Sequence, residues 1–393
     1  MFTFFFTTLF LSASFQAEYI FPPNEMHNHS SSIVECSDGS LLAAWFHGTG
    51  EREADNVVIQ GARKKAGDNH WSEIFLMADS PDLPDCNPVL FIDPRGVLWL
   101  FWSAIQDNEW GSALLKYRTS RDYLGDGAPK WDWQDIIHMR PLDLEERFFP
   151  VVDEGLNTYS SLIETLAPEK KDQIAAIRKQ GEEKLTQRLG WMGRTTPIML
   201  DDTTIMLGLY SDVFNYSLAV FTSDWGQHWK SSAPILDDDL LMLGNIQPAF
   251  VKRSNGDIVA FMRDNGLPQQ IRQSLSTDQG MHWSKVDFIG IPNPGSSVSA
   301  LALQSGVWLL VCNDTTLGRH LLTVYLSDDE GKSWHVSRRI EEAPEGEGNF
   351  SYPTLIQGAD QTLHLSYSYR RSGVEGSTIK HAAFTENWVR GID

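Results

Sequence analysis

Short apolar runs separated by tight turns recur along the whole chain. Pairs such as Asp38-Gly39 and Asn255-Gly256 lie between two such runs, which is a strong signal for a β-hairpin. Six strand–turn–strand units follow this pattern, at residues 32–45, 89–102, 198–210, 249–261, 298–311 and 354–367. The pattern predicts an all-β protein built from one repeated unit.

A second motif, Ser/Thr-x-Asp-x-Gly-x-x-Trp, follows three of these units. We call it the Asp box. Its copies recur at nearly constant spacing, at Thr222–Trp229, Ser276–Trp283 and Ser327–Trp334, and weaker copies lie at 66–71 and 120–131. The Asp can accept hydrogen bonds from turn amides, the Gly allows a positive φ, and the Trp is expected to cover the hairpin. Turn chemistry alone explains these residues, so a structural role is expected for them.

The two repeats together predict four strands in each unit. Such sheets cannot bury both faces alone, so they are expected to stack radially as a six-bladed β-propeller. Residues 18–393 would form this single domain, with Glu18–Phe21 completing the last blade. Residues 158–189 are rich in helix formers and predict a helical insertion between blades 2 and 3. The insertion is either a decoration of the edge or a wall beside the functional site.

The net charge of the chain limits the kinds of molecule that it can bind. The chain has 32 Lys and Arg against 52 Asp and Glu, a formal net charge of −20. Such a protein repels phosphate backbones and anionic lipid, which excludes nucleic acid and membrane surfaces as partners. A local cluster of arginines overrides this field at short range, so an anionic sugar is allowed.

The N-terminus predicts export. Residues 1–17 combine an apolar stretch with small residues, as in a signal peptide, so a secreted or periplasmic protein is expected. No other segment approaches the roughly 20 apolar residues of a transmembrane helix. The three cysteines, Cys36, Cys86 and Cys312, lack metal-ligand spacing, and a Cys36–Cys86 bridge is an option in an oxidising compartment. Neither a metal nor a cofactor is expected, and the oligomeric state is left open.

Polar residues recur at the start of each unit's first strand and in the loop after its second strand. In a propeller both positions face one end of the axis, so these residues should converge. At the strand starts they are His27, His29, Asn87, Arg194, Gln247 and Tyr352. In the loops they are Glu51, Arg52, Asp55, Asp107, Asn108, Glu109, Asp212, Asn215, Arg263, Asp264, Asn265, Asn313, Asp314, Arg319, Arg370 and Arg371. Arginines can clamp a carboxylate, and carboxylates, His or Tyr can move protons, as a carbohydrate site requires.

With these boxes and blades the chain resembles the sialidase (neuraminidase) superfamily, over nearly its whole length. The match looks closest to the Asp-box, or BNR-repeat, branch of exo-α-sialidase-like proteins. Segment 51–55 is similar to the stretch that bears the family's acid/base, which the resemblance places at Asp55. Segment 351–356 is similar to the strand that bears the nucleophilic tyrosine, which points to Tyr352.

The same resemblance suggests which residues bind the sugar. Arg263 and Arg370 are candidates for family arginines. Sialidases also carry an Arg-Ile-Pro motif whose arginine helps to bind the sialic acid carboxylate, and here that region reads His27-Asn-His29-Ser. The substrate-binding candidates are His27, Glu51, Arg52, Arg194, Arg263, Asp264 and Arg370.

Three functions are compatible with the sequence. We expect an exo-acting glycoside hydrolase that removes a terminal acidic sugar from a glycan, with Tyr352 as nucleophile and Asp55 as acid/base. In the alternative, His29 and Tyr352 transfer protons in β-elimination on a uronate-containing polysaccharide, as the similarity to propeller-type lyases implies. A non-catalytic glycan-binding propeller is the third, because this scaffold is widely reused. The acidic loop 51–55 favours hydrolysis, whereas His27 and His29 favour the lyase or a novel hydrolase.

Overall fold

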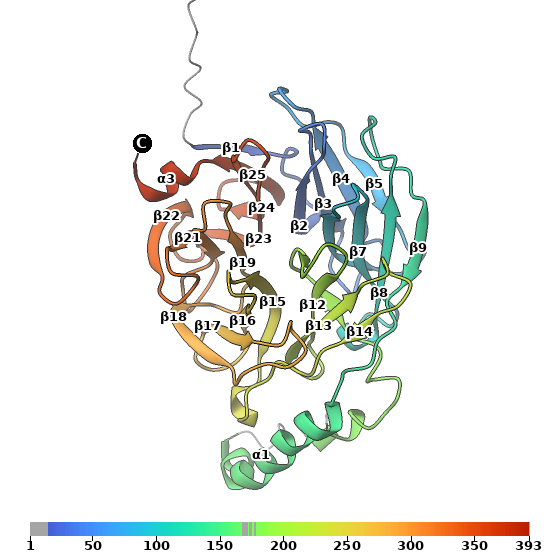
Figure 1. Cartoon of the computed structure of the whole chain (residues 1–393), viewed down its shortest axis with the longest axis vertical. Helices are drawn as coiled ribbons and strands as arrows, with labels where there is room; N and C mark the ends of the chain where they lie inside the picture. The colour runs from blue at the N-terminus through green and yellow to red at the C-terminus, as the bar shows by residue number, and fades with distance from the viewer. Residues whose placement is uncertain (1–14, 167–171, 173–174, 177, 393) are drawn as a thin grey trace, which may run out of the picture.

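Six antiparallel sheets surround a central axis in the computed structural model (Figure 1). The structure describes residues 15–392 except 167–171, 173, 174 and 177. Each sheet is one blade, whose first strand lies beside the axis and whose last strand lies at the rim. The predicted six-bladed β-propeller is therefore confirmed.

The first three blades follow one another along the chain. Blade 1 contains β2 (His27–Glu35), β3 (Leu41–Gly48), β4 (Val58–Lys64) and β5 (Phe75–Ala78). Blade 2 contains β6 (Asp85–Ile92), β7 (Leu98–Ile105), β8 (Ala113–Ser120) and β9 (Trp133–Ile136). Blade 3 contains β10 (Met192–Gly193), β11 (Ile198–Met199), β12 (Ile205–Ser211), β13 (Tyr216–Thr222) and β14 (Lys230–Ser231). Its inner strand is split, since β10 and β11 both pair with β12.

The remaining blades complete the ring. Blade 4 contains β15 (Asn245–Lys252), β16 (Ile258–Asp264), β17 (Gln270–Ser276) and β18 (Asp287–Pro292). Blade 5 contains β19 (Ser299–Ala302), β20 (Trp308–Cys312), β21 (Leu321–Ser327) and β22 (His335–Glu342). Blade 6 contains β23 (Gly348–Gln357), β24 (Leu363–Arg371), β25 (Thr378–Phe384) and β1 (Phe15–Tyr19). Short helices are η1 (Trp110–Ser112), η2 (Leu240–Met242) and α3 (Glu386–Arg390).

The N-terminal strand closes the ring, as predicted. β1 pairs with β25, with Glu18 opposite His381. It ends at Tyr19 rather than Phe21, because the Phe21 ring turns into the core and stacks on Trp45 of blade 1 at 4.7 Å. Residues 1–14 of the predicted signal peptide lie outside the described residues, and Phe15–Ala17 belong to β1. Export stays a prediction.

The Asp boxes form the tight turns that their sequence predicts. In each box the Ser or Thr hydroxyl bonds the Asp carboxylate and accepts the Gly amide, for example Gly280 N to Ser276 Oγ at 2.8 Å. The Asp carboxylate accepts an amide four residues on, as in His282 N to Asp278 Oδ1 at 2.9 Å. The residue before each Gly also has a positive φ, at Trp225, Gln279 and Glu330.

Two of the three box tryptophans contact the neighbouring blade, beyond the predicted covering of the hairpin, whereas Trp283 stacks on Phe250 of its own blade. Trp229 of blade 3 contacts Phe101 of blade 2 at 6.3 Å between ring centroids, and Trp334 of blade 5 contacts Phe261 of blade 4 at 5.4 Å. Gly226 lies so close to Trp99 and Tyr117 of blade 2 that an added Cβ would be about 3.0 Å from the tyrosine hydroxyl. The boxes therefore join neighbouring blades as well as closing turns.

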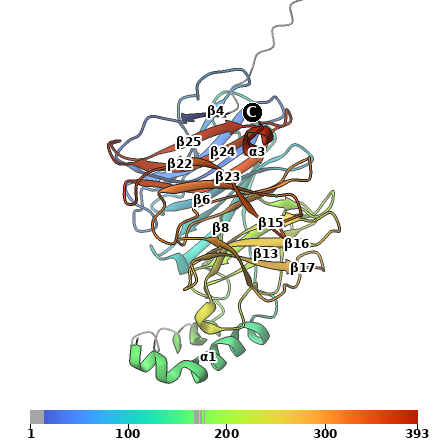
Figure 2. The same cartoon turned by 90° about the vertical axis from the view of Figure 1, so that its left-hand side faces the viewer.

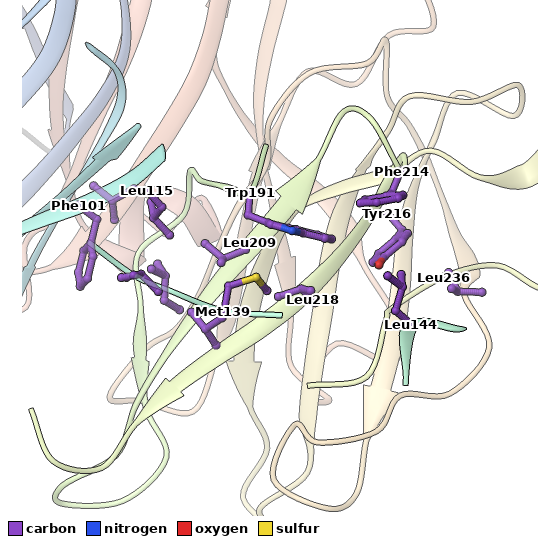
Figure 3. Close-up of a cluster of buried hydrophobic side chains, with 14 of the residues drawn as sticks. Phe101, Leu115, Met139, Leu144, Trp191, Leu209, Phe214, Tyr216, Leu218 and Leu236 are labelled. Carbon is purple, nitrogen blue, oxygen red and sulfur yellow. The ribbon is translucent and has the colours of Figure 1, made fainter. Parts of the chain in front are cut away.

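The predicted helical insertion lies between blades 2 and 3 and begins earlier than expected. Helix α1 spans Leu144–Leu166, so its first turns precede residue 158 despite Pro150 inside it. Leu144 and Phe148 are buried in the same cluster as Tyr216 of blade 3, and this packing stabilises the early start (Figure 3). The helix projects outside the ring, beyond blades 3 and 4 (Figures 1 and 2). No described helix is both long and apolar enough to cross a membrane.

All three cysteines are buried free thiols. The Cys36–Cys86 bridge considered from the sequence is not formed. Cys36 follows the last residue of β2, whereas Cys86 is the second residue of β6. Since both inner strands start at the same end of the axis, the two thiols lie at opposite ends of their blades.

Removing one box carboxylate should weaken the fold. We expect Asp278→Ala to lower the free energy of unfolding by about 1–3 kcal/mol, because the bonds from the His282 amide and the Ser276 hydroxyl are lost. Urea denaturation measures this change. Asp202→Ala, in an exposed turn of blade 3, serves as control and should leave stability unaltered. An unaltered midpoint for Asp278→Ala would contradict the role given to the box.

The boxes should also make stability depend on acid pH. Hydrogen bonds from the His228 amide and ring lower the pKa of Asp224 from 3.8 to about 2. A carboxyl with a depressed pKa stabilises the fold above its unfolded value, and that contribution disappears as the pH falls through the folded value. We expect thermal stability to drop between about pH 4 and pH 2. The drop should be shallower in Asp224→Asn, and an identical pH profile for both proteins would refute this origin.

Candidate functional site

A cavity of about 770 Å³ opens at one end of the axis. Residues of all six blades line it, so residues from opposite ends of the chain, such as His29 and Tyr352, meet there. Six of the ten predicted site residues are among them: His27, His29, Glu51, Arg263, Tyr352 and Arg370. The described part of the insertion contributes none of the lining residues, so it lies at the edge and is not a wall of this cavity.

A repeated irregularity of the inner strands aims side chains into the cavity. β2, β6, β15 and β23 each shift register near their start. The shift contains a residue of positive φ, which is Ser30, Asn87, Gln247 or Tyr352. In β6, β15 and β23 that residue precedes a proline, which cannot donate to the ladder. Left-handed backbone at non-glycine residues is strained and gathers at functional sites, and three of these four residues line the cavity.

Tyr352 lies at the centre of the site with 8% of its surface exposed. Its hydroxyl accepts hydrogen bonds from Arg263 Nη1 at 3.0 Å and from Gln247 Nε2 at 3.3 Å. The His29 ring lies 4.1 Å from its ring, centroid to centroid. The guanidinium carbons of Arg194 and Arg319 lie 4.9 and 5.4 Å from the ring centroid. One hydroxyl is thus fixed in a strongly positive setting.

Three arginines lie around this tyrosine, and their environments differ. Arg194 is 1% exposed and donates to the neutral Thr354 hydroxyl and Pro353 carbonyl, and burial lowers its pKa to about 10. Burial also lowers the pKa of Arg319. For Arg263 burial is outweighed by the neighbouring tyrosines and Asp212, which raise its pKa. Arg194 lies beneath the cavity rather than in its lining, contrary to its predicted role in binding substrate directly.

The two histidines stand side by side on β2. Their rings are 5.5 Å apart, and both make edge contacts with Phe46. Burial lowers the pKa of His27, and for His29 burial together with Arg319 lowers it well below its usual value. His29 is therefore a neutral imidazole at neutral pH and can accept a proton.

Two carboxyl groups, Glu51 of blade 1 and Asp212 of blade 3, also line the cavity. Burial raises the pKa of both, and Glu53 adds to the effect on Glu51. The nearby Arg263 partly offsets each shift, so both carboxyls share an arginine with Tyr352. A carboxyl with a raised pKa is suited to donate a proton.

Besides Arg194, three predicted residues lie away from the lining. Asp55 is exposed, and its Oδ1 accepts a hydrogen bond from Asn108 Nδ2 at 2.8 Å, so Glu51 is the carboxyl of that loop which faces the cavity. Asp264 is fully buried in an ion pair with Arg272 at 2.6 Å, which holds the end of β16. Arg52 stacks on Trp110, 5.2 Å from the ring centroid.

The sequence reasoning missed several lining residues. Tyr210 belongs to the apolar strand β12 and carries no sequence signal of its own, yet its hydroxyl accepts a hydrogen bond from Asn87 Nδ2 at 3.1 Å. Trp110 and Asn349 also line the cavity. Asp212 and Arg319 belonged to the predicted polar ring without an assigned role, and the loop position after a second strand was their signal.

A cluster of possible metal ligands lies elsewhere. Glu35, Asp360 and His364 have ligand atoms within 4.8 Å of one another, and no other such group occurs among the residues that the structure describes. Glu35 Oε2 accepts the Ala359 amide at 2.7 Å, so it clamps the turn between β23 and β24. None of the three lines the cavity.

Solved structures share this architecture. A protein of unknown function from Dyadobacter fermentans aligns with a TM-score of 0.68 and 16% identity, covering 94% of this chain and 98% of that one. A leech intramolecular trans-sialidase gives 0.67 and 13%, covering 98% and 72%. The intramolecular trans-sialidase from Ruminococcus gnavus gives 0.64 and 12%, covering 95% and 97%. Identities this low show the fold alone.

Comparison with sequence families agrees with the comparison of structures. No curated protein matches the chain. The model of the BNR repeat-like domain matches residues 39–148 and 179–365, which is most of the chain and omits the centre of the insertion. The chain therefore belongs to the BNR repeat-like domain family, with the six-bladed propeller fold that sialidases share.

Proposed function

We propose that the protein is an exo-acting glycoside hydrolase that removes a terminal acidic sugar from a glycan. The observation that carries the proposal is the Tyr352 hydroxyl, held by Arg263 and Gln247 in an axial cavity that Glu51 and Asp212 also line. Family membership and fold support a hydrolase of this general class. They do not identify the sugar, and the charges of the cavity support an acidic one.

An acidic sugar fits the positive side of the cavity. Arg263, Arg319 and Arg370 line it, and a guanidinium fork matches a carboxylate in geometry as well as charge. Arg194 adds a fourth positive charge beneath the Tyr352 ring. A neutral sugar would leave these four cations with only Glu51 and Asp212 as nearby counter-charges, and burying charge without full compensation is costly.

The groups can perform a two-step displacement at the anomeric carbon. Tyr352 Oη forms a bond to that carbon while the bond to the leaving oxygen breaks. Glu51 protonates the leaving oxygen, and His29 takes the phenol proton. Water then attacks the same carbon, Glu51 takes its proton, the bond to Tyr352 breaks, and His29 returns the proton to the phenolate. Glu51 here takes the acid/base role expected earlier for Asp55, because it faces the cavity.

The lyase remains a second candidate for one reason. The same contact between His29 and Tyr352 could serve proton abstraction and donation beside a uronate. β-Elimination leaves an unsaturated uronate that absorbs in the ultraviolet, whereas hydrolysis does not. Incubation with polyuronates should give no such absorbance, and a rise would select the lyase.

Tyr352→Phe should abolish turnover while leaving the fold intact. We expect a loss of about a thousandfold or more in kcat on aryl glycosides of sialic and uronic acids, since the nucleophile is removed. Tyr369→Phe, a second tyrosine of the cavity, is the matched control and should keep activity within a few-fold. Circular dichroism checks the fold. Full activity of Tyr352→Phe would exclude both enzymatic mechanisms.

Glu51→Gln and Asp55→Asn separate the two acid/base candidates. Because burial raises the pKa of Glu51, a general acid at this position works below that pKa and fails as the pH rises through it. We expect Glu51→Gln to lose this alkaline limb of the pH–rate profile, and to lose most activity on substrates with poor leaving groups. Asp55→Asn should resemble the wild type. The reverse pattern would return the role to Asp55.

A further inference from the structure

A second, smaller groove of about 250 Å³ lies between the edge of blade 2 and the Asp box of blade 3. Arg95 contributes to it from the turn between β6 and β7, and Trp225 from the turn between β13 and β14. The loops that line the axial cavity are at the other ends of these strands. The groove is therefore at the far end of the blades, remote from Tyr352.

One wall is a row of side chains across blade 2. Trp99 pairs with Thr119, and Thr119 pairs with Trp133, so the three lie side by side on the face towards blade 3. Trp99 is buried beneath the groove, whereas Trp133, on the outermost strand, is 58% exposed. Tyr117 lies next to this row, and its hydroxyl bonds the Gly226 carbonyl of blade 3 at 3.0 Å. The wall is thus rigid and ends in an exposed indole.

The other wall carries an aromatic residue that the turn does not require. Trp225 occupies the box position held by Gln279 in blade 4 and Glu330 in blade 5, and all three residues have φ near 60°. Arg95 stacks on its ring at 3.6 Å and is itself held by an ion pair with Asp93 at 2.6 Å. The Trp225 ring is therefore fixed in place by groups outside the box.

We propose that this groove binds a pyranose ring of a glycan. Indole faces cover the C–H face of a sugar, and the exposed Arg121, Asp135 and Gln227 line the same groove and can bond its hydroxyls. With a volume of about 250 Å³, the groove is slightly smaller than the pockets that hold drug-sized ligands. It matches a small polar ligand with one apolar face. The proposal shares only the ligand class with the proposed function and needs no turnover.

Binding here would keep the protein on a polymeric glycan while the axial cavity works on chain ends. Two linked sites raise the local concentration of substrate without any new contact in the cavity. The groove should therefore affect polymers and not small aryl glycosides.

Affinity electrophoresis through gels containing pectic galactan, rhamnogalacturonan or hyaluronan tests the proposal. All proteins carry Tyr352→Phe, so that no substrate is consumed. We expect retardation by at least one polysaccharide, with affinity reduced about tenfold by Trp133→Ala and by Trp225→Gln. Trp225→Gln installs the residue that blade 4 carries, so the turn should fold. Val336→Ala, on the outer strand of blade 5 and 55% exposed, is the matched control and should not change retardation.

Three outcomes would overturn the proposal. They are no retardation by any of the polysaccharides, equal retardation of the groove variants and the control, and a change of oligomeric state in Trp133→Ala with retardation unaltered. The last would identify the indole as a protein contact. Because the groove variants are scored on binding alone, failure of the hydrolase proposal leaves this result readable, and the reverse also holds.

Discussion

The pairing of β1 with β25 is the contact on which the rest of the structure depends, because it turns a row of blades into a ring. Glu18 strengthens this closure from β1. Its carboxylate accepts bonds from Lys64 Nζ at 2.6 Å and Trp71 Nε1 at 3.2 Å in blade 1 and lies 3.1 Å from His381 of blade 6. Burial raises the pKa of Glu18, but His381 and Lys64 outweigh it and bring the pKa to about 2. One ionised side chain thus joins the first and last blades. Without closure, β2 and β23 would separate, and with them His29 and Tyr352.

The two ends of the propeller axis have different roles: one stabilises the fold, and the other contains the candidate site. At the far end, Asp boxes satisfy turn amides and pack glycine and tryptophan against the neighbouring blade. At the near end, the inner strands break their regular ladder, and left-handed residues such as Gln247 and Tyr352 point towards the axis. Strained backbone is tolerated there because ladders on both sides of each bulge hold it in place. The rigid far end therefore makes the irregular near end possible.

This division also explains what the sequence could predict. Box and hairpin signals are local, so blade number, ring closure and the convergence of about half of the polar ring followed from them. Other predicted ring residues lie elsewhere: Asn313 bonds backbone carbonyls and Asp314 pairs with Arg339. Glu51 and Asp55 are four residues apart in one loop, and only tertiary packing decides which of them faces the cavity. The same limit applies to α1, whose start at Leu144 depends on packing against blade 3, and to Arg194, which starts blade 3 yet lies beneath the cavity. The position of Tyr210 in the cavity could not be predicted, because the sequence of an apolar strand does not distinguish a core residue from one that lines a cavity.

The electrostatics of the cavity oppose those of the whole protein. A net charge of −20 repels anions at long range, but screening limits that field to about 8 Å in physiological salt. Arg263 and Arg319 in the cavity lining and Arg194 beneath it surround one tyrosine. The contacts that fix them are largely neutral: hydroxyls, carbonyls and the tyrosine ring itself. His29 adds no charge, because burial and Arg319 keep it neutral. The buried cations are thus better compensated when an anion enters the cavity than when it is empty. The selection for an acidic sugar that we propose is therefore a short-range property, set by four blades and unaffected by the acidic surface.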